Sequence, residues 1–345
     1  MKRIILLLLA LLLIPTLVQA DIFAKVGTAG LQFLKIGVDA RAIGMAEAYT
    51  AYTKGASSTY WNVAGLAYST GTELFLNHTR YVADINYDYL TIAFPTSFGV
   101  FGINGSLLYM DWMDVTTADE FGPNGEQFTC SDMMAGLSYA TMLTDKFSVG
   151  LSFKYLRENL DEYDVNGWGI DLGSLYNTGW KDLTIGMSLR NFGPEVKYTL
   201  DNDGDGLIDE DPYDLLDNDA DGLVDEDREE LSFALPMNFS LGIAMSILES
   251  NMQSLDAVFQ IDNCVDRLET YNAGLEYRIG TFFLRSGYQF NLDCQAASFG
   301  LGWKLATSFA VMDIDAAYTP FGKLEEKMDG QFLTGPIRLS LKMKF

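Results

Sequence analysis

The chain has 345 residues, with 23 Lys and Arg against 47 Asp and Glu and a single His, and its formal charge is −24. So acidic a chain makes a poor partner for nucleic acid, because that contact depends on Lys and Arg beside the phosphates. One His argues against multi-His metal sites and His-based catalysis. A content of 48% hydrophobic and 13% aromatic residues argues against disorder.

The first twenty residues have the pattern of a secretory signal peptide. Lys2 and Arg3 precede an apolar run that ends at Pro15, and small residues lead up to Ala20. We therefore predict that residues 1–20 are a signal peptide cleaved after Ala20. The alternative is a retained membrane anchor, but the run is shorter than the ~20 residues that a spanning helix needs. No later stretch is long and apolar enough to span as a helix, so any membrane crossing must use strands.

Beyond residue 71 the chain alternates apolar and polar residues with period two. Phe147, Val149 and Leu151, for example, alternate with Ser148 and Gly150. Such a strand has one apolar face. About fourteen segments of roughly ten residues or more follow this pattern, as strands that cross a bilayer do. They start near residues 72, 85, 98, 130, 146, 164, 181, 236, 253, 269, 281, 294, 308 and 335.

The loops between these segments indicate a barrel and its orientation. Short turns follow the even-numbered segments, whereas long loops follow several odd-numbered ones, at 111–129, 193–235 and 319–334. We therefore predict an all-β fold, a closed antiparallel transmembrane β-barrel of about 14 strands over residues 72–345. The expected location is the bacterial outer membrane, in contact with its lipid, with the long loops outside. Phe345 at the end of the last strand is typical of chains inserted by the outer-membrane assembly machinery. A large secreted all-β protein is the alternative.

Residues 21–71 lack the period of two. They are rich in Ala and Gly, and their apolar residues are spaced irregularly, nearer to a helical pattern. We call this segment the hatch and expect it to form short helices and turns. A barrel of this size has a lumen too wide for wall side chains to fill, so we predict that the hatch plugs it.

Two runs in the hatch carry a family resemblance. The runs GLQFLKIGVDARAIGMAEAY, at residues 30–49, and ASSTYWNVAGLA, at 56–67, resemble the signature of the PorV/PorQ family of outer-membrane proteins. That family is similar in fold to the FadL-type barrels, which have fourteen strands and an N-terminal hatch. The matching positions that we single out are Asp39, Arg41, Gly44, Met45, Glu47, Asn62, Gly65 and Leu66.

The resemblance also implies roles for individual residues. Val63 replaces the proline of the usual Asn-Pro-Ala-Gly-Leu motif, which removes a fixed φ angle. We still expect Asn62 and Gly65 to form the turn. We expect Arg41 and Glu47 to pair and fix the hatch inside the barrel, and a role in ligand binding is the alternative.

The resemblance implies two functions between which no residue discriminates. Some relatives receive exported proteins at the cell surface in type IX secretion, and FadL-type relatives pass hydrophobic small molecules across the outer membrane. We favour the first function and keep the second as the alternative. We expect no enzyme activity, because no nucleophile elbow, phosphate-binding loop or zinc-helix motif occurs in the sequence.

An acidic insert at 194–235 is the strongest local signal. Residues 201–230 hold fifteen acids and one base, in two copies of a Ca²⁺-loop pattern. In each copy, position 12 departs from the usual acid, as Pro212 and Arg228. We predict a structural Ca²⁺ site in this extracellular loop, and a solvated acidic loop without an ion is the alternative. The predicted ligands are Asp201, Asp203, Asp205, Leu207 and Asp209 in the first copy, and Asp217, Asp219, Asp221, Leu223 and Asp225 in the second.

The three cysteines are expected near the long-loop ends of strands. A disulfide among Cys130, Cys264 and Cys294 is allowed in an oxidising location. Because their number is odd, at least one stays free or pairs with another molecule.

Overall fold

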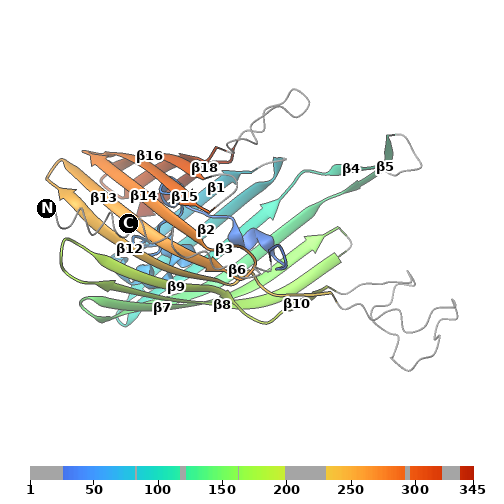
Figure 1. Cartoon of the computed structure of the whole chain (residues 1–345), viewed down its shortest axis with the longest axis horizontal. Coiled ribbons are helices and arrows are strands. Elements are labelled where there is room, and N and C mark those ends of the chain that lie inside the picture. Colours follow the sequence, from blue (N-terminus) through green and yellow to red (C-terminus); the bar gives the residue numbers. More distant parts are fainter. Residues whose placement is uncertain are drawn as a thin grey trace.

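The computed structural model describes residues 26–81, 84–116, 122–161, 163–198, 231–291, 296–320 and 335–345. Within these ranges, fourteen antiparallel strands form one closed barrel, in which β1 pairs with β18 (Figure 1). The strands are β1 (Glu73–Arg80), β2 (Asn86–Thr96), β3 (Gly99–Tyr109), β6 (Cys130–Thr144), β7 (Phe147–Leu160), β8 (Tyr163–Asn177), β9 (Thr184–Phe192), β12 (Asn238–Glu249), β13 (Gln253–Cys264), β14 (Thr270–Ile279), β15 (Phe282–Phe290), β16 (Ala297–Ala306), β17 (Val311–Tyr318) and β18 (Ile337–Lys344).

The predicted barrel is confirmed, strand by strand. Each predicted start lies within three residues of an observed strand start. The expected length of ten residues is wrong for β1, β17 and β18, which have eight residues each. The β17–β18 ladder ends between Tyr318 and Ile337, next to Pro336. A proline has no backbone N–H with which to extend the ladder.

Two short hairpins extend the long-loop end of the barrel. The strands β4 (Met113–Thr116) and β5 (Pro123–Phe128) pair in the connection between β3 and β6. The strands β10 (Val196–Tyr198) and β11 (Leu231–Phe233) pair in the connection between β9 and β12. Both hairpins lie at the end opposite to the C-terminus (Figure 1).

The two faces of the wall differ as the period of two predicts. On β7, Leu151 and Phe153 are exposed on the outer face, whereas Ser152 between them points inward and is fully buried. The same alternation puts Leu, Ile, Phe and Met on the outer face of the other strands. Such a face is stable next to lipid hydrocarbon, which does not require polar groups.

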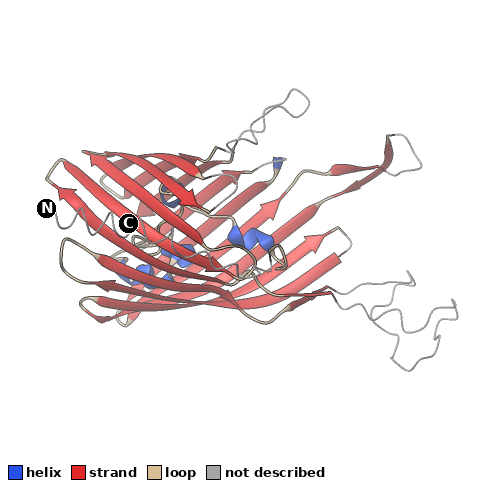
Figure 2. Ribbon diagram, in the orientation of Figure 1, coloured by secondary structure: helices blue, strands red, loops and turns tan. Residues whose placement is uncertain are grey.

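The hatch lies inside the barrel, where Figure 2 shows its helices surrounded by strands. Its helices are η2 (Gln32–Lys35), α2 (Ala40–Ile43), α3 (Ser58–Trp61) and η3 (Val63–Tyr68). The α2 helix contacts β16, β17 and β18, and η3 contacts β3, β6, β7 and β8. The largest buried hatch side chains are Leu31, Met45, Trp61 and Leu66. The hydrophobic core of the molecule is therefore the hatch, packed against inward-facing wall residues such as Phe75 and Tyr89.

No helix in the described ranges is long and apolar enough to cross a membrane.

Candidate functional site

Pairs of wall glycines let the hatch backbone lie directly on the barrel wall. Gly150 on β7 is the register partner of Gly173 on β8. A Cβ atom on Gly150 would lie 2.6 Å from the carbonyl carbon of Val63, and one on Gly173 would lie 2.9 Å from the amide nitrogen of Ala64. A Cβ atom on Gly173 would also clash with Asn62 Oδ1. Both positions must stay free of a side chain, because the backbone of Val63 and Ala64 and the bonded Asn62 amide occupy the space.

Two more pairs repeat this arrangement. Gly186 and Gly242 are register partners below Ala51, and Gly274 and Gly287 are register partners below Met45. A Cβ atom on Gly186 would lie 2.7 Å from Ala51 Cα, and one on Gly274 would lie 2.6 Å from Met45 Cβ. We call the three pairs the glycine seats. They were missed from the sequence, where each glycine is merely one small residue on the polar face of its strand.

The first signature run forms a capped turn against β1 and β18. Asp39 accepts a hydrogen bond from the backbone N–H of Arg41, 3.0 Å away, and so caps α2. The backbone N–H of Asp39 donates to Asn77 Oδ1 on β1 at 3.0 Å. Gly44, at the end of α2, packs on Gly300, where a Cβ atom would lie 2.9 Å from Gly300 Cα. The signature residues Asp39 and Gly44 thus position the hatch.

The second signature run forms the turn that its motif implies. The backbone N–H of Gly65 donates to the carbonyl oxygen of Asn62 at 2.9 Å. The Asn62 side chain accepts from Ala64 N and donates to the carbonyl oxygens of Thr50 and Ser174, at 2.9 and 3.0 Å. Asn62 therefore joins two parts of the hatch to β8. Val63 needs no proline ring in this turn, because the hydrogen bonds of Asn62 hold it.

The predicted pairing of Arg41 with Glu47 is wrong. Arg41 makes a two-fold contact with Glu276 on β14, with Nε–Oε2 at 2.8 Å and Nη2–Oε1 at 2.6 Å. Ala46 and Glu47, with φ angles of 55° and 63°, form a left-handed turn after α2. Glu47 instead lies beside Gly37, with Oε1 2.9 Å from the position of a Cβ atom there. Burial raises the pKa of Glu47, against the lowering effect of Arg267, Arg338 and Arg190.

Glu276 is the centre of a buried charge network that we call the latch. Its carboxylate also accepts from Arg285 Nε at 2.6 Å, and Arg285 Nη1 donates to Asp315 Oδ1 at 2.6 Å. Tyr52 of the hatch donates its hydroxyl toward Glu276 at 2.9 Å. The side chains of Glu276 and Arg285 are each 2% exposed. Arg41, Glu276, Arg285 and Asp315 therefore bind the hatch to three wall strands through alternating charges.

A polar chamber lies beside the latch, toward the short-turn end of the barrel. It has a volume of about 230 Å³. The hatch contributes Arg41 and Tyr52 to its lining, and the wall contributes both acidic and basic residues. The chamber is therefore suited to water and ions and not to an apolar solute. The wall residues are Asp256, Glu276, Arg278, Arg285, Lys304, Asp313 and Asp315, together with Ser254, Gly280 and Phe283.

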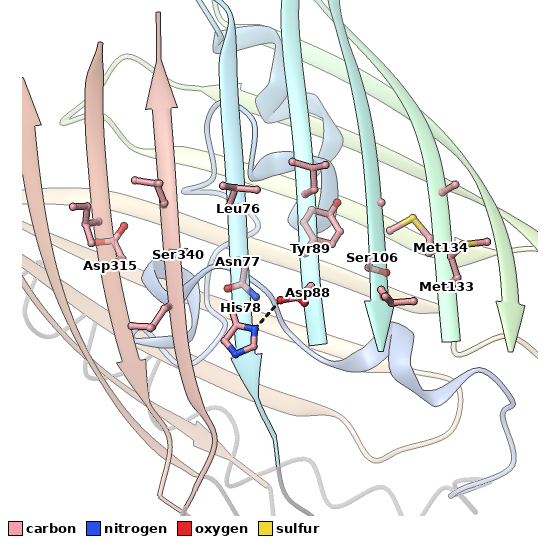
Figure 3. Close-up of a pocket in the computed structure, with 17 residues that line it drawn as sticks. Leu76, Asn77, His78, Asp88, Tyr89, Ser106, Met133, Met134, Asp315 and Ser340 are labelled. Carbon is pink, nitrogen blue, oxygen red and sulfur yellow. Dashed lines mark hydrogen bonds and ion pairs between the residues drawn. The ribbon is translucent and has the colours of Figure 1, made fainter. Parts of the chain in front are cut away.

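A second cavity, which we call the outer groove, has a volume of about 800 Å³ and runs across β17, β18, β1, β2, β3 and β6 (Figure 3). Its exposed lining is mainly apolar, with Leu76, Leu90 and Met133, and also includes His78 and Asp88. The inward-facing residues at its back are buried, with exposed fractions of 2% for Tyr89 and 3% for Met134. The outer groove thus ends at the wall.

Several predicted residues lie outside the described ranges or have no role that the structure tests. The signal peptide, all ten predicted Ca²⁺ ligands and Cys294 lie outside the described residues. Cys130 and Cys264 are free thiols and do not pair with each other. Phe345 is exposed, and its backbone N–H donates to Thr72 O at 2.9 Å, so it fastens the chain end to the start of β1. Its role in insertion stays a prediction.

Comparison with solved structures finds the same barrel at low sequence identity. The monoaromatic hydrocarbon channel CymD matches with a TM-score of 0.53 at 14% identity, over 90% of this chain and 98% of that chain. The Pseudomonas putida toluene transporter TodX matches with a TM-score of 0.53 at 11% identity, over 89% and 96%. A Pseudomonas aeruginosa FadL homologue matches with a TM-score of 0.52 at 12% identity, over 90% and 98%. At these identities the likeness establishes the fold alone.

The family comparison goes further than the fold. No curated protein matches the chain. The family model described as type IX secretion system protein PorV matches residues 19–227, which include the hatch and the first seven barrel strands. The match covers more than half of the chain and includes both signature runs. With its closed barrel and apolar outer face, the protein is located in the bacterial outer membrane. The chain belongs to the PorV family of outer-membrane β-barrel proteins.

Proposed function

We propose that this protein acts in protein secretion or surface attachment, of the type IX kind, by binding exported proteins at the cell surface. It acts by binding and without catalysis. The observation that carries this proposal is the family match over residues 19–227. The outer-membrane assembly machinery is the further partner that we propose, during insertion of the barrel.

The alternative is a channel for hydrophobic small molecules, which the names of the similar structures suggest. Such a channel needs an apolar pocket beside the hatch and an opening in the wall. The chamber beside the latch is polar, and the outer groove is closed by buried side chains at its back. The secretion proposal needs neither feature, and we therefore favour it.

The long-loop end offers a surface for an exported protein. Trp112 and Met113 at the start of the β4–β5 hairpin are 65% and 53% exposed. Large exposed aromatic side chains are frequent anchors of protein contacts. The hairpin extends away from the barrel wall (Figure 1), so a partner can reach it without entering the lumen.

Purification from the native outer membrane in mild detergent tests the proposal. Exported proteins should co-purify at stoichiometric levels and be identified by mass spectrometry. A Trp112→Ala variant should lower their recovery roughly tenfold or more, because an aromatic anchor contributes strongly to a protein interface. Trp180→Ala is the matched control, since Trp180 is 52% exposed in the short turn between β8 and β9. Recovery of hydrophobic small molecules with no exported protein would favour the alternative.

We also propose that the acidic repeats bind Ca²⁺ outside the cell. The support is their sequence alone, with acids alternating about a Gly in each copy. Replacing Asp203, Asp205, Asp219 and Asp221 with Asn should abolish Ca²⁺ uptake by the full protein in equilibrium dialysis at millimolar Ca²⁺. Replacing four acids of the barrel wall far from the repeats would not change it. Equal Ca²⁺ uptake by the repeat variant and the wall variant would show that the acidic repeats do not bind Ca²⁺.

A further inference from the structure

The outer groove follows the register of the strands. Six outward-facing residues on neighbouring strands are successive cross-strand partners, and Gly105 and Ala135 at one end of this row are small. The large side chains beside them leave a depression over the two small ones. The row consists of Ile314, Leu341, Leu76, Leu90, Gly105 and Ala135.

The next row toward the long loops is polar at its centre. His78 and Asp88 are cross-strand partners on the outer face, and His78 Nδ1 lies 2.7 Å from Asp88 Oδ1 (Figure 3). Asp88 Oδ2 accepts a hydrogen bond from the hydroxyl of Tyr109 at 3.2 Å. Two residues further along β1, Arg80 pairs with Asp84 at 2.9 Å. The groove is therefore apolar along its length and carries charged groups at its outer end.

The position of the groove restricts what can fill it. It opens to the membrane, because its lining residues Leu76, Leu90 and Leu107 belong to the lipid-facing surface. It has no path to the lumen, because Asn77, Tyr89 and Ser106 at its back are buried. An occupant must therefore arrive from within the bilayer.

We propose that the outer groove binds the acyl chain of an outer-leaflet lipid, whose polar headgroup lies beside His78 and Asp88. Its volume of about 800 Å³ is within the range of roughly 300–1,000 Å³ in which proteins bind small ligands. A lipid matches the groove in polarity, because its apolar acyl chain would lie along the apolar row and its polar headgroup would lie at the end nearer the long loops. The wall of a second barrel would bring a broad row of side chains, which a depression over Gly105 and Ala135 does not match. The assignment rests on the wall alone and is independent of the cargo.

Filling the groove tests this assignment. A Cβ atom on Gly105 would meet nothing nearer than Met134 O at 3.4 Å, so Gly105→Leu adds a side chain to the groove without a backbone clash. Ala135→Leu is the second variant, and it serves if the first fails to insert. Ala273→Leu is the matched control, because Ala273 also faces outward but lies on β14, five strands from β1 around the barrel.

Each protein is purified from its own outer membrane in mild detergent, and retained lipid is counted by native mass spectrometry. We expect one lipid on the wild type and on Ala273→Leu. In Gly105→Leu and Ala135→Leu, the new side chain should displace about two methylene groups of the acyl chain from the groove, which should lower the amount of retained lipid roughly tenfold. Faster migration on unheated gels confirms that each barrel is folded. Equal lipid on all four proteins would overturn the assignment, as would a barrel dimer or a non-lipid molecule that the groove variants displace.

Discussion

Replacing Glu276 with Gln is expected to release the hatch while the barrel stays closed. Among the described residues, Glu276 is the only carboxylate that forms ion pairs with both Arg41 and Arg285. Gln keeps the shape of the side chain but removes its charge. Arg285 keeps its ion pair with Asp315, whereas Arg41 loses its ion-pair partner. Loss of one partner from a buried pair costs about 3–5 kcal/mol. Because the Arg41 side chain is 30% exposed, water compensates in part, so we expect a cost near the lower value, about 3 kcal/mol.

Two measurements follow the hatch in this variant. Protease should cleave residues 26–71 faster than in the wild type, and the conductance of single barrels in planar bilayers should rise. Arg157→Gln is the control, because the Arg157–Asp164 pair is exposed on the outer wall and should contribute nothing measurable. If Glu276→Gln keeps the protease resistance and conductance of the wild type, apolar packing holds the hatch and the latch is dispensable.

The strands could be predicted from the sequence because the signal is local. Each strand that crosses the membrane has one apolar face and one polar face, so apolar and polar residues alternate along it. A segment of about ten residues is therefore enough to recognise a strand. An even number of antiparallel strands also lets the first and last strands pair and close the barrel. In the structure, Phe345 at the chain end accordingly lies next to the start of β1. The turn from Asn62 to Gly65 in the hatch could be predicted for the same reason, because its two ends are only three residues apart in the chain.

The latch could not be predicted, because its partners are far apart in the chain. Arg41 and Glu276 are separated by 235 residues, and their meeting depends on the rotation of the hatch inside the barrel. We expected Glu47 as the partner of Arg41 because both residues match polar positions of the family signature. Arg41 pairs with Glu276 instead, and Glu47 lies in a left-handed turn with Ala46. Such a turn is uncommon at residues other than Gly, so the local sequence does not predict it.

The glycine seats lie between these two cases. The six glycines lie at inward positions of strands with alternating residues, so the sequence predicts that they are on the inner face: Gly150, Gly173, Gly186, Gly242, Gly274 and Gly287. That they form register pairs requires the pairing of neighbouring strands, which the sequence leaves open. To predict which residues pack on these glycines, the position of the hatch inside the barrel must be known as well.

The glycine seats lead to the second large effect, a Gly150→Ala variant that lifts the hatch. The new Cβ atom would lie 2.6 Å from the carbonyl carbon of Val63 and 2.7 Å from the amide nitrogen of Ala64. Neither atom can rotate away as a side chain could, so the turn from Asn62 to Gly65 has to shift. Overpacking of this kind costs about 1–3 kcal/mol. The shift would also weaken the hydrogen bond from Asn62 to Ser174 O, which joins this turn to β8.

The urea midpoint of hatch release, followed by cleavage of residues 26–71, measures this cost. Gly150→Ala should lower the midpoint, and the Gly150→Ala, Gly173→Ala double variant should lower it by less than twice as much, because both methyl groups displace one turn. Gly105→Ala is the matched control, since its methyl group points outward and meets nothing nearer than 3.4 Å. Equal midpoints for Gly150→Ala and Gly105→Ala would mean that the hatch rests on the latch and not on close backbone contact. A lower midpoint for Gly150→Ala alone, with wild-type conductance retained below it, would show that the seats hold the hatch down while the latch still keeps it in the lumen.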